Sequence, residues 1–170
     1  MKKIYDKDEV NFALIWIGIY VVLSSVAENL SAAIGIEKVV TAPLNVALAI
    51  FLFTWVKKYH LEEKHGLCKY HGNAKQYLYF IPLVLLATTN LWGGVRLNFS
   101  IMETILYVVS MMCVGFLEEM IFRGFLFTAM CKGNVKIAIL VSSLTFGAGH
   151  IVNLLNGREV FETLDRKSVV

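Results

Sequence analysis

The chain has 170 residues, enough for one domain, and 57% of them are hydrophobic while only 17% are charged. Soluble globular domains average about 45–50% and about 25% for these two classes, so the composition excludes an ordinary soluble domain. The net charge of +3 gives no indication of a nucleic-acid partner. Three cysteines without a CxxC spacing argue against a disulfide framework.

The hydrophobic residues are gathered in blocks of about 18–25 residues, the length that crosses a hydrocarbon core about 30 Å thick. We therefore predict an all-α fold, a polytopic helix bundle in the lipid bilayer with about five transmembrane helices. In chain order the predicted helices cover residues 12–34, 39–56, 77–95, 101–130 and 135–155.

The polar connection over residues 57–76 is interpreted as a solvated cytoplasmic loop. Its potential zinc ligands, His60, His65, Cys68 and His71, match no zinc-finger spacing. With the N-terminus inside, the inner segments hold ten Lys and Arg residues and the outer loops hold two. This bias predicts a multi-pass protein of the cell membrane with a cytoplasmic N-terminus.

The fourth predicted helix carries three ionisable residues among apolar neighbours, Glu118, Glu119 and Arg123. Each such side chain costs about 2.5–3.5 kcal/mol inside a membrane helix, so it is usually paired and functional. Arg123 follows Glu119 by one turn, which favours an ion pair, while Glu118 points about 100° away around the helix. A carboxyl outside the ion pair suits general-base work on water. The alternative is a buried, purely structural ion pair, with Glu118 against a partner helix.

The fifth predicted helix carries Phe146, His150 and Asn153 at spacings of four and three residues, so the three share one helical face. Gly147 and Gly149 allow a neighbouring helix to approach closely. A histidine on one membrane helix and two glutamates on the preceding one are able to orient a single water for attack on a carbonyl.

The pattern Glu118-Glu119-x-x-x-Arg123, followed on the next helix by Phe146-x-x-x-His150, resembles the CPBP family of intramembrane glutamic endopeptidases. That family includes the CAAX prenyl endopeptidases and the bacterial Abi proteins associated with bacteriocin self-immunity. The resemblance is strongest over residues 110–157, where the surrounding residues are similar to bacterial members.

The resemblance implies that Glu118 activates water, that Glu119 assists it or is held by Arg123, that His150 completes the water site and that Phe146 shapes its wall. Asn153 is added only because it shares their face. No cofactor is expected. Zinc is the alternative, but a catalytic zinc site normally takes three protein ligands, and the membrane helices offer a single histidine.

The family's third motif, a histidine with Asn or Asp four residues later, has no counterpart here. We therefore expect a C-terminal truncation in which the last helices are missing. The predicted division is an N-terminal transmembrane hairpin and cytoplasmic loop (1–76), an incomplete protease core (77–157) and an aberrant polar tail (158–170).

The expected function is hydrolysis of peptide bonds in membrane-associated or lipidated peptides. An inactive chain, a partner that supplies the missing histidine, and a slow residual site all stay open. The alternative from another class is a non-catalytic membrane protein for peptide binding or bacteriocin self-immunity. An ion-transporter fragment is less favoured, because no pair of broken helices is predicted.

Overall fold

The computed structural model of the chain describes residues 1–69 and 100–155, with a few positions between 73 and 88, and its side chains up to residue 148. The described elements are all helices, which confirms the all-α class. They are α1 (Lys2–Lys7), α2 (Glu9–Ile34), α3 (Thr41–Lys58), α5 (Ile101–Glu118), the π-helix η2 (Glu119–Phe127), α6 (Thr128–Cys131) and α7 (Val135–Leu155). Four of the five predicted blocks are therefore helical, and the block over 77–95 falls largely outside the described residues.

Polar residues fix where two of the long helices begin. The Asp8 carboxylate accepts hydrogen bonds from the backbone N–H groups of Val10 and Asn11, at 2.9 and 3.0 Å, at the start of α2. Ser100 and Glu103 form a reciprocal capping box at the start of α5. These contacts satisfy N–H groups that have no partner inside the helix. The capping residues Asp8 and Ser100 thus determine where α2 and α5 begin.

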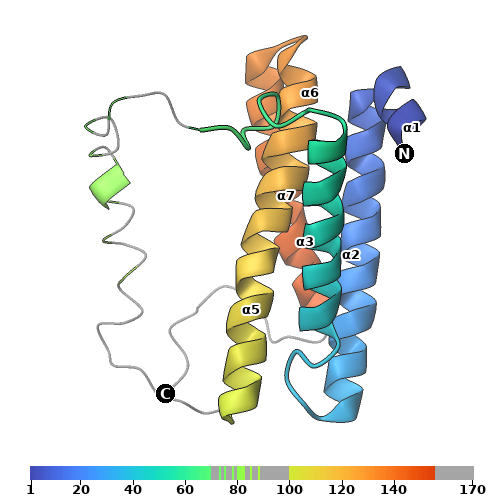
Figure 1. The fold of residues 1–170 in the computed structure, drawn as a ribbon, viewed down its shortest axis with the longest axis vertical. Helices are drawn as coiled ribbons and strands as arrows, with labels where there is room; N and C mark the ends of the chain where they lie inside the picture. The colour runs from blue at the N-terminus through green and yellow to red at the C-terminus, as the bar shows by residue number, and fades with distance from the viewer. Residues whose placement is uncertain are drawn as a thin grey trace.

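The helices pack side by side, and η2 lies between α2 and α7 (Figure 1). The elements α5, η2 and α6 follow one another in a single rod, with α3 against α5 and α7 against η2 and α6. An aromatic cluster fills the core near the N-terminus, where the rings of Phe12 and Trp55 stack at 5.0 Å and Phe125 of η2 packs edge-on against both. The π-helix is therefore held by the main core.

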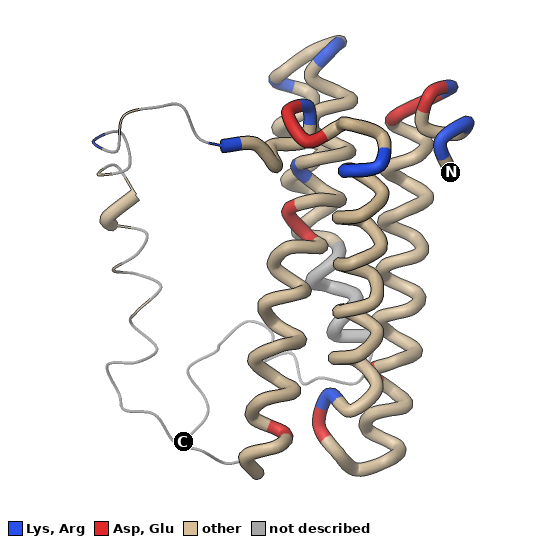
Figure 2. Tube along the Cα trace, viewed as in Figure 1, with Lys and Arg blue, Asp and Glu red and all other residues tan. Residues whose placement is uncertain are grey.

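Two helical segments, Glu9–Ile34 and Ile101–Cys131, are long and apolar enough to cross a membrane. Large apolar side chains cover their outer surfaces; Val22 is 60% exposed and Met112 is 74% exposed. Figure 2 shows the charged residues mainly at the two ends of the bundle, apart from a short acidic stretch in the upper half of the α5–η2 rod. The distribution is that of a membrane protein, because bare apolar surface of this extent is rare in soluble monomers.

Buried polar side chains join α3 to its neighbours. The Asn45 side-chain amide donates to the Ser110 hydroxyl of α5 at 3.0 Å, and both residues are fully buried. Between α2 and α3, the Thr41 hydroxyl donates to the Glu28 carboxylate at 3.0 Å, and the same carboxylate pairs with Lys38. Hydrogen bonds between side chains of neighbouring helices help to hold membrane helices together.

Candidate active site

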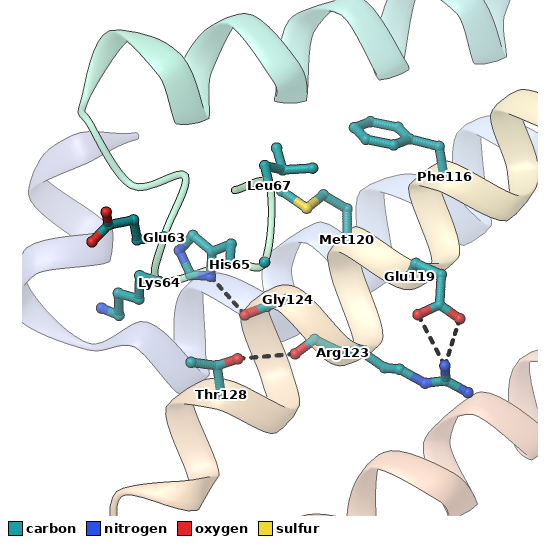
Figure 3. A pocket seen from close by; sticks show the side chains of 11 residues that line it. Glu63, Lys64, His65, Leu67, Phe116, Glu119, Met120, Arg123, Gly124 and Thr128 are labelled. Atoms are coloured by element: carbon teal, nitrogen blue, oxygen red, sulfur yellow. Dashed lines mark hydrogen bonds and ion pairs between the residues drawn. The ribbon is translucent and has the colours of Figure 1, made fainter. Parts of the chain in front are cut away.

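The glutamate motif lies where the helix changes its hydrogen-bond pattern. Glu118 is the last residue of α5, Glu119 is the first of η2, and Arg123 lies in the middle of η2. In a π-helix each N–H bonds to the carbonyl five residues back, and such segments occur frequently at functional sites. The Thr128 hydroxyl donates to the Arg123 carbonyl at 3.1 Å, which gives this backbone group a side-chain partner (Figure 3).

Glu119 and Arg123 form the ion pair that their spacing predicts. One guanidinium nitrogen, Nη1, lies 2.8 Å from Oε1 and 3.0 Å from Oε2 of Glu119 (Figure 3). The side chains are 60% and 74% exposed within the described part of the chain. The contact between the two side chains is confirmed; whether its role is structural or functional stays a prediction.

Glu118 is half-buried, whereas Glu119 is exposed and is paired with Arg123 on its own helix. The two adjacent carboxylates thus have separate environments, as expected from their angular separation on a helix.

A cavity of about 150 Å³ lies between η2 and α7. It brings together four of the predicted site residues, Glu118, Glu119, Arg123 and Phe146. The Phe146 ring meets the edge of Phe122 at 5.4 Å, which closes one part of the wall. The other lining residues are Ser142 and Ser143.

The two serines and Phe122 were missed by the sequence analysis. Ser142 is one helical turn before Phe146, so its position on the cavity side of α7 follows from the spacing already used for His150. Its hydroxyl donates back to the Ile139 carbonyl at 3.2 Å. Phe122 follows Glu118 by four residues, so the same spacing argument places it on the cavity side of the rod.

His150 and Asn153 lie on α7, but their side chains are outside the described residues. Their predicted roles therefore rest on helical spacing from Phe146. His150 follows Phe146 by one turn, and the helix continues without interruption from Val135 to Leu155. That these residues face the cavity stays a prediction.

A second cavity, of about 470 Å³, shares Glu119 and Arg123 with the first. Its remaining walls come from the loop after α3 and from one face of the α5–η2 rod (Figure 3). Loop residues 63–67 contribute one wall, and Phe116, Met120, Gly124 and Thr128 contribute the other. The ion pair therefore stands between a small cavity next to α7 and a larger one under the loop.

The interpretation of this loop as a solvated connector is wrong for His65, which is 7% exposed. Its Nδ1 lies 2.7 Å from the Gly124 carbonyl and its Nε2 lies 3.0 Å from the Tyr5 hydroxyl. Burial lowers the pKa of His65, and the nearby Lys64 and Lys132 act in the same direction. Both ring nitrogens are thus occupied. Among the described residues, no three potential ligands gather to hold a metal ion.

These observations define a class: a membrane helix bundle with a Glu-Glu-Arg motif on one helix and an aromatic and polar face on the next, around one cavity. Residues 100–164 match the family model described as type II CAAX prenyl endopeptidase Rce1-like. The match confirms, for this segment, the resemblance predicted from the two motifs. The comparison with curated proteins found no match, and neither did the comparison with solved structures.

Proposed function

We propose that the chain is an intramembrane endopeptidase that hydrolyses peptide bonds of membrane-associated or lipidated peptides, with Glu118 as the base that activates water. The observation that carries the proposal is the cavity lined by Glu118, Glu119, Arg123 and Phe146, within the segment that matches the CAAX endopeptidase family model. Charged side chains are energetically costly in apolar membrane helices. They are therefore rare there, and those that occur usually serve a function.

The proposal gives the two glutamates different roles. Arg123 engages both oxygens of Glu119, so Glu119 serves as a fixed charge beside the cavity. Glu118 serves as the base: it takes a proton from water as the oxygen attacks the carbonyl carbon, and returns it to the amine as the C–N bond breaks. His150 completes the water site from α7, and Phe146 and Phe122 limit the space around it. The products are a carboxylic acid and an amine.

We propose a multi-pass arrangement in a bacterial cell membrane, with the N-terminus in the cytoplasm. Lys64 and Lys132 both bind Glu9, at 2.6 and 2.8 Å, so basic residues from two segments meet at the start of α2, at the end of the bundle that holds the N-terminus (Figure 2). Basic residues concentrate on the cytoplasmic side of membrane proteins. On this placement the larger cavity, under the loop after α3, lies toward the cytoplasm.

The decisive experiment compares Glu118→Gln with Glu103→Gln in membranes that contain the full chain and a fluorogenic lipidated peptide. Both substitutions remove one carboxylate from the same helix, but Glu103 caps the far end of α5. We expect Glu118→Gln to lower the cleavage rate by about 10²-fold or more, the usual loss when a general base is removed, and Glu103→Gln to leave it within about twofold. Unchanged cleavage by Glu118→Gln contradicts the proposal. Peptide binding without cleavage by the parent chain favours the non-catalytic alternative.

A further inference from the structure

The loop after α3 contacts the π-helix through one buried side chain. His65 bridges Tyr5 of α1 and Gly124 of η2, which are far apart in the sequence. Because a carbonyl only accepts, Nδ1 must carry the proton and donate to Gly124, and Nε2 then accepts from the Tyr5 hydroxyl. The neutral Nδ1–H tautomer makes both bonds at once.

The packing around this bridge is close. The His65 ring meets the edge of Phe125 at 4.9 Å and lies 5.9 Å from the Tyr5 ring. A Cβ added at Gly124 would lie 3.2 Å from Met120 Sδ and 3.8 Å from His65 Cβ. The distance to His65 Cβ is an ordinary van der Waals contact, so a side chain at residue 124 would press on Met120 of its own helix rather than on the loop.

The bridge ends next to the charged pair. Gly124 follows Arg123, whose guanidinium holds Glu119, and all three line the larger cavity together with His65 (Figure 3). A π-helix is an irregular segment, so its backbone position depends on contacts from outside the helix. A shift of the Gly124 carbonyl moves the Arg123 backbone and the ion pair with it.

The geometry points to His65 as a positioning residue: by donating from Nδ1 to the Gly124 carbonyl it fixes the π-helix and thereby places Glu119 and Arg123 beside the cavity. The inference deepens the proposed function, on which its catalytic consequence rests. A misplacement of about 1 Å is enough to cost a large factor in rate. His65 itself does not line the smaller cavity.

Three variants test whether the Nδ1–H donor of His65 is the group that matters. His65→Asn keeps an N–H donor near the Nδ1 position, His65→Gln keeps a polar group near the Nε2 position, and His65→Ala keeps neither. The matched control is His60→Asn, which removes an exposed imidazole from the same loop at a left-handed backbone position (φ 53°) that Asn tolerates.

The test measures two quantities on the full chain in membranes: amide hydrogen exchange of residues 119–127 relative to residues 101–112, and kcat and KM for the lipidated peptide. We expect His65→Ala to speed exchange in 119–127 by about fivefold, the factor for one net hydrogen bond, with exchange in 101–112 unchanged. We expect kcat to fall by about tenfold, KM to stay unchanged, and Asn but not Gln to restore both quantities.

Unchanged exchange in 119–127 for His65→Ala, an equal effect of His60→Asn, or a rescue by Gln as full as that by Asn overturns the inference. If His65→Ala does not fold, the comparison of Asn with Gln decides it. If the parent chain cleaves no peptide, the proposed function fails, and the exchange measurement still decides whether His65 positions η2.

Discussion

One guanidinium nitrogen bridges both oxygens of Glu119, and this contact distinguishes the two adjacent glutamates. The pair lies at the first turn of the π-helix, between two cavities, and is exposed to both. In the proposed mechanism Arg123 holds Glu119 as a fixed charge, and Glu118 is the carboxylate that acts on the water.

Removal of the guanidinium is expected to impair catalysis more than folding. Arg123→Gln should lower kcat by about 10²-fold, the usual cost of one preorganised electrostatic group, and Arg123→Lys should recover part of the rate because it keeps the charge without the planar fork. Initial rates in membranes measure both variants. Lys136→Gln, which removes an exposed cation from the first turn of α7, serves as the control. If Arg123→Gln is as active as this control, the ion pair has no role in the reaction.

The spacing of Glu119 and Arg123 was sufficient to predict their contact, because i and i+4 neighbours meet on any regular helix. The change to a π-helix was not predictable from the same residues, since a five-residue hydrogen-bond pattern depends on packing against α2 and α7. The serines of α7 share the face of Phe146 and were accessible to the same reasoning. Its extension to His150 and Asn153 stays a prediction.

At the scale of elements, the loop after α3 is part of the site. The hydrophilic sequence of residues 57–69 indicates solvent, yet His65 lies 59 positions from its partner Gly124 and is buried against it. Contacts over such separations leave no periodic signal in a sequence. The loop is therefore where the predicted and observed structures differ most.

The buried imidazole makes stability depend on pH. Burial is the main cause that lowers the pKa of His65 from its usual 6.5, and Lys64 and Lys132 add to that effect. The hydrogen bond to Gly124 and the charge of Glu9 oppose it. The rings of Tyr5 and Phe125 pack against the same imidazole. The unfolded chain therefore binds a proton below about pH 6.5 that the folded chain resists. We expect the free energy of unfolding to be constant above pH 7 and to fall as the pH decreases below 6.5 toward the lower, folded pKa.

Denaturant unfolding in detergent between pH 8 and pH 5 measures this dependence. His65→Asn removes the titrating group and should reduce the slope below pH 6.5, whereas His60→Asn should leave it unchanged. If the unfolding free energy falls equally steeply below pH 6.5 in the parent chain and in His65→Asn, a group other than His65 causes the pH dependence.

The contact between α3 and α5 is expected to stabilise the bundle through a single hydrogen bond. Asn45→Ala leaves the buried Ser110 hydroxyl without its donor and should lower the free energy of unfolding by about 1 kcal/mol, the usual scale for polar contacts between membrane helices. Ser110→Ala should cost less in that background than alone. Thr54→Ala is the control, since within the described part of the chain its hydroxyl bonds to the carbonyls of Ile50 and Phe51 in its own helix. If the losses in unfolding free energy caused by Asn45→Ala and Ser110→Ala simply add in the double variant, the two side chains are not coupled and the prediction is wrong.

At the scale of the whole molecule, composition and the length of the hydrophobic blocks predicted the all-α class, and the two motifs predicted the family whose model residues 100–164 match. The packing of α2 and α3 onto the α5–η2 rod was beyond the sequence, because helices that are apolar on all sides carry no amphipathic stripe to indicate their neighbours. The division at residues 76 and 157 stays a prediction.

The proposed cytoplasmic location of the N-terminus can be tested with a cysteine of the chain itself. Cys68 is exposed on the loop after α3, and Cys113 and Cys131 are half-buried. In a chain with the other two cysteines replaced by Ser, we expect a membrane-impermeant maleimide to label Cys68 in inside-out vesicles and not in right-side-out ones. A cysteine placed at Glu37, on the exposed turn between α2 and α3, should show the opposite pattern. Reversed labelling of both contradicts the orientation.

The central claim is that Glu118 and His150, on successive helices, act on one water. The most direct measurement is kcat for Glu118→Gln, for His150→Ala and for the double variant, all in membranes with the same lipidated peptide. Residues that act as a unit have strongly non-additive effects, so the double variant should be about as slow as the slower single variant. A double variant slower by the product of the two single factors would show that the residues act independently, and would contradict the claim.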